Sequence, residues 1–229
     1  MRNNQNGPYM RIRTLIAVSA ALLVAGTLVS CSNKTKGTEE PKDVNLPVKT
    51  LVVVDVQRDF YDPSGSLYVT GSEVLPEKIA ALAGEYDAVV FTLDWHPGNH
   101  CSFKEEGGIW PKHCVQNTVG AGLPDCFTPI LSDPGKFRIF LKGTQQDKEQ
   151  YGAFETAEEI DPVILSWFES SEEIDVCGIA GDYCVKESTS NLLNFVPAEK
   201  VTMLLDCIRS IDDGTALKDF VEEKGLKTK

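Results

Sequence analysis

Three reactive side chains follow three separate apolar runs of the chain. Asp55 comes after the first run, Lys142 after the third and Cys184 after the fourth. Asp55 could take a proton from the Cys184 thiol and later give it to a leaving amine, while Lys142 could hold Asp55 ionised and balance the thiolate. Taken singly, an aspartate at a strand end is commonly a turn or helix cap and a lysine a solvated charge. As a set, the three residues predict a hydrolytic triad.

Cys184 has the most informative local sequence of the three. A cysteine is a nucleophile only as thiolate, and a helix N-terminus or a nearby cation lowers the pKa of its thiol. We expect Asp182 to cap a helix that begins there, which would put Cys184 in the first turn. The alternative is a small buried apolar residue, which is how we interpret Cys177 and Cys207.

A second group of side chains has the composition of a metal site. Asp94 and His96 are two residues apart, so on an extended segment their side chains leave on the same side. With His113 they form a carboxylate and two imidazoles, a set that suits zinc, iron or manganese and leaves positions open for water or substrate. For His100 three interpretations stay open: it is a fourth metal ligand, a residue that contacts a ligand, or an ordinary loop residue. The alternative is a purely structural metal site. Such sites usually use cysteine ligands, and Cys101 and Cys114 border the cluster.

The elements that must position these residues are short apolar runs alternating with helical patterns. Strands that are apolar on both faces and alternate with helices indicate a parallel sheet covered on both sides, with its site at the carboxyl ends of the strands. The sequence therefore predicts a layered α/β domain. The expected strands are 50–56, 88–93, 137–141, 174–180 and 200–205, and the expected helices are 73–85, 182–195 and 215–223.

Composition limits the class of protein. The 229 residues are 42% hydrophobic and 24% charged, which suits one globular domain with a tail. The 34 acidic against 22 basic residues give a net charge of −12, so nucleic acid is not an expected partner. Besides Cys31 and Cys184 an odd number of cysteines remains, so disulfides cannot pair all of them; Cys101 with Cys126 is one candidate pair.

The N-terminal segment has the pattern of an export signal. Arg11 and Arg13 precede an apolar run of about fifteen residues, shorter than the roughly 20 that span a bilayer and typical of a signal-peptide core. The run ends in LVSC, which resembles a bacterial lipobox, so we expect residues 1–31 to be a lipoprotein-type signal peptide with Cys31 as the lipidated residue. The alternative is an ordinary N-terminal helix with a chance cysteine. Residues 32–48 are expected to be a flexible linker. The domain from residue 49 to 229 would then be lipid-anchored at the bacterial cell envelope, outside the cytoplasm.

Five motifs in order resemble the nicotinamidase (pyrazinamidase) family of isochorismatase-like cysteine hydrolases, and the resemblance covers the chain from about Leu51 to its end. It implies a three-layer α/β/α fold around a mostly parallel sheet of about six strands. The motifs are VVDVQRDF, DWHPGNH, WPKHCVQNTVGA, FLKGTQQDKEQYGAF and GIAGDYCV.

The resemblance also implies a role for each matching residue. Residues 49–229 would be a hydrolase domain with Asp55, Lys142 and Cys184 as its catalytic residues. It further implies a cis peptide between Ile179 and Ala180. The remaining implied roles are an oxyanion hole from the N–H groups of Ala180 and Cys184, substrate contacts from Phe60, Trp110 and Tyr151, and metal ligation by Asp94, His96 and His113, with His100 matching a ligand found in part of the family.

The function implied is metal-dependent hydrolysis of nicotinamide to nicotinic acid and ammonia through a thioester, with zinc as the expected metal and iron or manganese as alternatives. Gly181 and Arg58 depart from the family pattern, and neither removes a reacting group. The export signal is a third departure, because it would place the catalytic thiol outside the cytoplasm, where it meets oxidants. Three alternatives remain: another amidohydrolase acting on a carbamoyl or ureido compound, a non-catalytic lipid-anchored protein that binds a ligand or metal, and an envelope interaction module. A homo-oligomer is left open.

Overall fold

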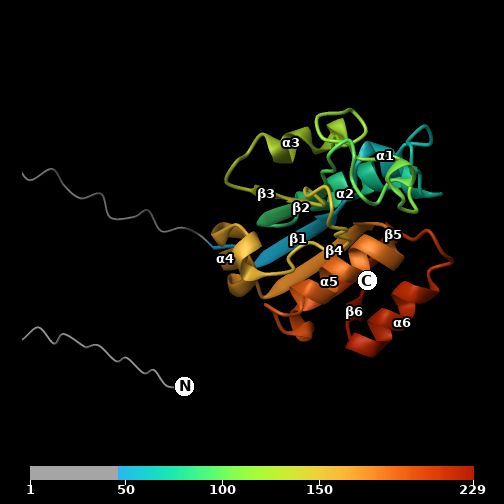
Figure 1. Cartoon of the computed structure of the whole chain (residues 1–229). Helices are drawn as coiled ribbons and strands as arrows, with labels where there is room; N and C mark the ends of the chain where they lie inside the picture. The colour runs from blue at the N-terminus through green and yellow to red at the C-terminus, as the bar shows by residue number, and fades with distance from the viewer. Residues whose placement is uncertain (1–45) are drawn as a thin grey trace, which may run out of the picture. The chain divides into compact units, whose positions relative to one another are not determined.

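A six-stranded sheet forms the centre of the domain in the computed structural model, which describes residues 46–229 (Figure 1). The strand order is β3-β2-β1-β4-β5-β6, and every neighbouring pair is parallel. This confirms the expected α/β class and the expected number of strands. The strands are β1 (Lys49–Val54), β2 (Ala88–Asp94), β3 (Phe137–Lys142), β4 (Glu173–Ile179), β5 (Val201–Arg209) and β6 (Lys227–Thr228).

Helices cover both faces of this sheet and complete three layers. One face packs against α1 (Arg58–Tyr61), α2 (Leu75–Ala83) and α3 (Thr128–Leu131). The opposite face packs against α4 (Pro162–Ser170), α5 (Lys186–Leu192) and α6 (Thr215–Lys224). Short 3₁₀ turns lie at 72–74, 104–106, 125–127, 157–159 and 198–200.

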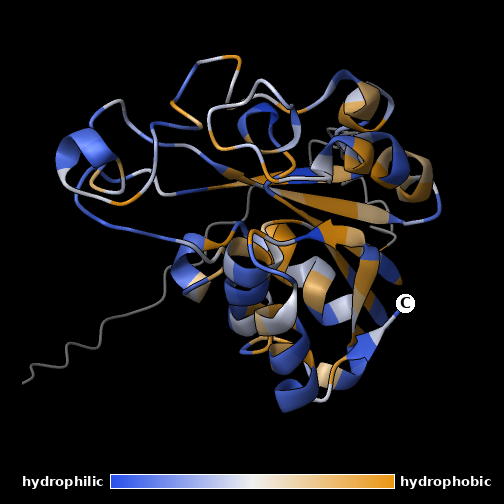
Figure 2. Ribbon diagram, turned by 90° about the vertical axis from the view of Figure 1, so that its right-hand side faces the viewer, coloured by the Kyte–Doolittle hydropathy of each residue, from blue (hydrophilic) through white to orange (hydrophobic). Residues whose placement is uncertain are grey.

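The two faces of strand β1 explain why the layers form. Leu51 and Val53 are buried against the α2 side, while Val52 and Val54 are buried against the α4–α6 side. A strand that is apolar on both faces can bury its side chains only between two layers of helices. Figure 2 shows the same pattern in the sheet as a whole, with mostly hydrophobic strands at the centre and helices of mixed hydrophobic and hydrophilic residues around them.

The expected helices at 73–85 and 182–195 are both divided. The first is a 3₁₀ turn at Ser72–Val74 followed by α2, whose first turn contains Pro76. Proline is suited to that position because it has no N–H to pair. The second is a π-helical turn at Gly181–Val185 followed by α5. Helices α1, α3 and α4 and strand β6 were not among the expected elements.

The expectation that Asp182 caps this turn is wrong. Ala180 occupies the cap position, and no side chain caps the turn. The Asp182 carboxylate instead accepts hydrogen bonds from the backbone N–H groups of Ile211 and Asp212, at 2.9 and 3.0 Å. Asp182 therefore binds a loop 29 residues further along the chain instead of capping its own turn.

The cysteines also give a clear result. Cys101 and Cys126 are both free, so the candidate disulfide is absent from the structure, whereas Cys177 and Cys207 are buried as expected. Within residues 46–229, no helix is long and apolar enough to cross a membrane. The expected signal peptide, Cys31 and nearly all of the expected linker lie outside the described residues.

Candidate active site

The carboxyl ends of four adjacent strands bring the candidate residues together. Asp55 directly follows β1, Asp94 ends β2, Lys142 ends β3, and Cys184 lies in the turn that follows β4. Asp94 and Lys142 are register partners in the sheet, so their side chains start from neighbouring positions. In a parallel sheet this edge is where connecting loops gather and where ligand sites form.

The buried ammonium of Lys142 is the centre of the group. Its Nζ lies 2.8 Å from Asp55 Oδ2 and 2.5 Å from Asp94 Oδ1, and it is 3.5 Å from Cys184 Sγ. Asp55 is fully buried as well, and its other carboxylate oxygen accepts a 2.6 Å hydrogen bond from the Thr92 hydroxyl. The structure thus joins the three residues of the expected triad in one contact network.

Burial and charge set the protonation of this network. Burial raises the pKa of the Cys184 thiol well above its ordinary value, and the Lys142 charge only partly opposes that effect. Burial also raises the pKa of Asp55, again against the influence of Lys142. Burial disfavours a charged Lys142, but the Asp55 and Asp94 carboxylates outweigh it and raise the pKa of the ammonium well above its usual range. A resting thiol beside a carboxylate of raised proton affinity is suited to proton transfer.

The backbone around the thiol has the geometry that the family resemblance implies. The Ile179–Ala180 peptide bond is cis, and the turn carrying Cys184 begins directly after it. Asp55 has a φ of 50°, a conformation that non-glycine residues adopt infrequently. Its N–H donates to the carbonyl of Thr92 at 3.1 Å, which holds this residue against the end of β2.

The expected metal ligands form a second compact group beside the first. One ligand atom each from Asp94, His96 and His113 lies within 4.8 Å of the other two, and all three residues are buried. The Nδ1 of His96 is 2.9 Å from the carbonyl of Gly143, and the Nδ1 of His113 is 2.7 Å from the carbonyl of Pro111.

These contacts determine which imidazole nitrogen can bind a cation. A carbonyl only accepts, so each Nδ1 must carry a proton and each Nε2 faces Asp94, at 3.5 Å from Oδ2 for His96 and 3.8 Å for His113. Hydrogen bonding of the outer nitrogen to a carbonyl is the usual way in which a metal-ligating histidine is oriented. Two imidazoles and a carboxylate directed at one point therefore fit a divalent cation.

His100 lies beside this group but is not directed into it. Its Nε2 donates to the carbonyl of Lys148 at 3.0 Å, and its Nδ1 lies 2.7 Å from the Ser102 hydroxyl. The ring stacks on His96 with centroids 4.2 Å apart. With both nitrogens engaged, His100 supports the His96 ring and has no free nitrogen to offer a cation in this structure.

Gly143 shows why the loop after β3 needs a glycine. Its φ is +61°, and a Cβ at this position would overlap the His96 ring. The carbonyl of Gly143 also accepts the hydrogen bond that orients His96. Gly143 therefore lets the backbone approach the His96 ring closely and also fixes the orientation of that ring.

An aromatic-walled cavity lies over both groups. The expected substrate residues Phe60, Trp110 and Tyr151 line it, and the Trp110 Nε1–H donates to the Tyr151 hydroxyl at 3.0 Å. Ala180 and Cys184 line it as well, so the expected oxyanion donors border the same space. The sequence interpretation did not identify further lining residues, which are Leu67, Val69, Glu149, Gln150, Tyr183 and Ile211.

Of these lining residues, Tyr183 is the one that the sequence could most easily have identified. It directly precedes Cys184, and its ring lies 5.2 Å from Trp110 and 5.4 Å from Tyr151, centroid to centroid. Adjacency to the candidate nucleophile was a signal that could have identified it. Ile211 gave no such signal, because it lies in a loop after β5, 27 residues from Cys184.

The fold and this site define a class, the cysteine hydrolases with an isochorismatase-like α/β fold. No family model matches the chain. The chain is 35% identical over 177 residues to the nicotinamidase/pyrazinamidase of Mycobacterium tuberculosis, with 74% of this chain and 91% of the relative covered. It is 31% identical over 208 residues to the nicotinamidase of Saccharomyces cerevisiae, with 77% and 95% covered.

A solved structure agrees with these relatives. The pyrazinamidase of Pyrococcus horikoshii in complex with zinc superimposes with a TM-score of 0.65 at 31% identity, covering 80% of this chain and 99% of that one. The chain belongs to the nicotinamidase/pyrazinamidase family.

Proposed function

We infer that this protein hydrolyses nicotinamide to nicotinic acid and ammonia. The observation that carries the inference is the convergence of Cys184, Lys142 and Asp55 beneath a cavity walled by aromatic rings. The curated relatives are named nicotinamidases, which supports the same substrate. A flat heteroaromatic amide suits the cavity, since rings can pack on its walls while the carboxamide reaches the thiol.

The residues support a two-stage reaction. In the first stage Asp55 accepts the Cys184 proton, the thiolate attacks the carboxamide carbon, and the C–N bond breaks as Asp55 returns the proton to the departing ammonia. In the second stage water, deprotonated by Asp55, attacks the thioester, and the C–S bond breaks to release nicotinic acid and the thiol. Lys142 keeps its charge throughout and offsets negative charge on Asp55 and Cys184.

The N–H groups of Ala180 and Cys184 are the donors that we assign to the developing oxyanion. Both residues line the cavity next to the thiol. Donors fixed in place stabilise the charge of the tetrahedral intermediate more than the neutral carbonyl of the substrate, and losing one such donor costs about 10²- to 10³-fold in turnover.

We assign a divalent metal, with zinc as the first choice, to Asp94, His96 and His113. When bound, the ion would hold the ring nitrogen of the substrate and so orient the carboxamide. Burial lowers the pKa of His113 and so favours its neutral imidazole, the form that binds metals. At His96 burial acts in the same direction, but the Asp94 carboxylate outweighs it and raises the pKa. Zinc accepts this mixture of nitrogen and oxygen ligands, as do iron and manganese.

The proposed activity is tested by measuring ammonia release from a panel of small amides by purified protein. We expect nicotinamide and pyrazinamide to be hydrolysed, loss of activity with a chelator, and recovery on adding zinc. Hydrolysis of carbamoyl or ureido compounds in place of nicotinamide would assign the chain to another amidohydrolase reaction. No release from any amide by metal-loaded protein would refute the enzymatic function. Light scattering on the same sample gives the oligomeric state.

We further propose that residues 1–31 are a lipoprotein signal peptide, that 32–48 are a linker, and that acylated Cys31 anchors the 49–229 domain to the cell envelope. The basic residues, the apolar run and the LVSC sequence support this proposal. Labelling cells with a fatty-acid analogue should tag the wild-type protein in the membrane fraction. A Cys31→Ser variant should lose the label, and a variant that keeps it would contradict the assignment.

A further inference from the structure

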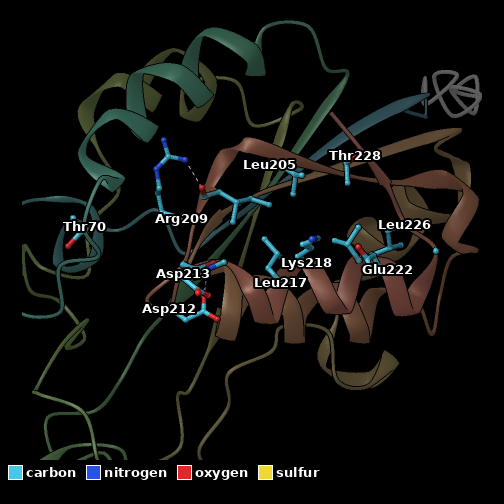
Figure 3. Close-up of a pocket in the computed structure, with 15 residues that line it drawn as sticks. Thr70, Leu205, Arg209, Asp212, Asp213, Leu217, Lys218, Glu222, Leu226 and Thr228 are labelled. Atoms are coloured by element: carbon cyan, nitrogen blue, oxygen red, sulfur yellow. Dashed lines mark hydrogen bonds between the residues drawn. The ribbon is translucent and has the colours of Figure 1, made fainter.

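The segment 210–213, between β5 and α6, separates two cavities of very different size. Ile211 lines the active-site cavity, which is the narrower of the two. Ser210, Asp212 and Asp213 line a groove of about 880 Å³ between β5 and α6, where Figure 3 shows Asp212 and Asp213 at the end nearest Arg209. An outward movement of this segment would therefore widen the narrow cavity at the expense of the large one.

Asp182 holds the segment in place from the catalytic side. Its carboxylate accepts the N–H groups of Ile211 and Asp212 at 2.9 and 3.0 Å, and the residue is 8% exposed. Hydrogen bonds from N–H groups to a carboxylate are among the stronger ones in proteins. Because Asp182 lies two residues before Cys184, one side chain ties the cavity wall to the turn that carries the thiol.

Packing at Gly181 makes the same connection. A Cβ at this position would overlap the Ser210 hydroxyl and lie 2.9 Å from Ile208 and 3.1 Å from Leu217. The turn and the segment are thus in contact with no space for a side chain between them. This accounts for the glycine at a position where family members usually carry a larger residue.

Ile211 is the apolar member of the segment and lies at the mouth of the active-site cavity. Its side chain is 48% exposed, although most large apolar side chains of the domain are buried. It lines the active-site cavity and also an adjoining pocket shared with Leu67 and Trp110. An exposed apolar side chain at the mouth of an aromatic cavity is placed to contact a ring that enters it.

We propose that Asp182 is a positioning residue which, by holding Ile211 at the cavity mouth, limits this enzyme to single-ring amides. The inference rests on the proposed amidase function and adds a determinant of substrate size. Asp182 does not line the active-site cavity, and its carboxylate is hydrogen-bonded to the N–H groups of Ile211 and Asp212, so its proposed effect on the substrate passes through Ile211.

The test compares kcat/KM for nicotinamide with kcat/KM for quinoline-3-carboxamide, which carries a second fused ring. Ile211→Ala should raise the bicyclic-to-monocyclic ratio about tenfold, the scale on which small changes in an apolar pocket alter selectivity. Ile211→Trp should lower the ratio. Asp182→Asn should raise the ratio in the same direction as Ile211→Ala, because an amide can accept only one of the two N–H groups and presents its own donor to the other.

The double variant distinguishes an indirect role from an independent one. If Asp182 acts through Ile211, combining Asp182→Asn with Ile211→Ala should raise the ratio no further than Ile211→Ala alone. Asp213→Asn is the matched control, because Asp213 lies in the same segment but accepts only from the N–H of Thr215 at the start of α6. Its ratio should equal that of the wild type.

Each outcome bears on one proposal. A wild-type protein that hydrolyses no amide contradicts the proposed function. A wild-type protein that hydrolyses nicotinamide while Ile211→Ala and Ile211→Trp leave the ratio unchanged contradicts the role of Ile211, and this result does not require Asp182→Asn to fold. Additive effects in the double variant, or a change in kcat alone with Asp182→Asn, contradict positioning through Ile211.

Discussion

Two aspartates on neighbouring strands of the sheet are buried equally but have different surroundings. Asp55 follows β1 at its carboxyl end, and Asp175 lies on β4 near its amino end; their exposures are 0% and 1%. Asp55 contacts Lys142 and Thr92 within the site. Asp175 accepts a 2.6 Å hydrogen bond from the Tyr86 hydroxyl and pairs with Lys229 at 3.3 Å.

The difference shows that burial of a charged group does not by itself mark a reactive site. Asp55 shares its cation with a thiol and borders an aromatic cavity, whereas the Tyr86 hydroxyl satisfies one oxygen of Asp175 and no hydrogen-bond donor of the described residues reaches the other. Buried charged groups in structural networks resemble catalytic ones until their partners are considered. We therefore expect Asp55 to control rate and Asp175 to control stability.

The largest expected effect comes from removing the reacting groups. Cys184→Ala should abolish ammonia release, because no other group can form the thioester. Asp55→Asn should lower kcat by about 10³-fold, within the range for loss of a general acid–base. The matched control is Asp175→Asn, which should keep wild-type kcat. Ammonia assays with circular dichroism to confirm folding check these results, and wild-type turnover by Cys184→Ala would exclude it from the reaction.

Loss of the metal ligands should have the next largest effect. His96→Ala should lower the metal content of the purified protein and raise KM for nicotinamide, because the substrate ring loses its orientation. Elemental analysis gives the first result and steady-state kinetics the second. His100→Ala should retain the metal, since both nitrogens of His100 are bonded elsewhere. Unchanged metal content in His96→Ala would show that the ligand set is wrong.

The stability side of the comparison predicts a smaller effect. Tyr86→Phe removes the short hydrogen bond to Asp175 Oδ2 and leaves that oxygen only the half-exposed Lys229 ammonium at 3.3 Å. It should reduce the free energy of unfolding by about 1.5–3 kcal/mol, the contribution of a hydrogen bond to a charged group. Urea denaturation measures this change. Ammonia release by the folded variant should equal that of the wild type, and a loss of turnover without a loss of stability would contradict the structural role of Asp175.

The smallest effect concerns pH. Burial raises the pKa of Asp55 above its ordinary value of 3.8. Asp55 accepts the thiol proton only when ionised, so kcat/KM should fall as pH falls through this raised pKa. The acid limb of the profile of kcat/KM against pH should therefore lie above pH 3.8. Tyr86→Phe should leave the limb in place. A rate that stays constant down to pH 3.8 in folded enzyme would contradict Asp55 as the base.

Much of the site was predictable because parallel strands end at a common edge. The apolar runs identified β1 to β5, and that arrangement alone implies that Asp55, Asp94, Lys142 and Cys184 meet. The structure brings these residues together with His96, His113 and the three expected aromatic residues. His100 was left open by the sequence because its engagement depends on Ser102 and the carbonyl of Lys148.

By itself, the sequence determined the class of fold and the set of reacting groups, because strand composition and motif order are properties of neighbouring residues. Only the tertiary structure decided how Asp182 is used, which residues complete the cavity, and that Cys101 and Cys126 form no disulfide. The reason is physical. Capping is a contact between neighbours in sequence, but packing after β5 places two N–H groups of a distant loop against Asp182, and these occupy both oxygens of its carboxylate.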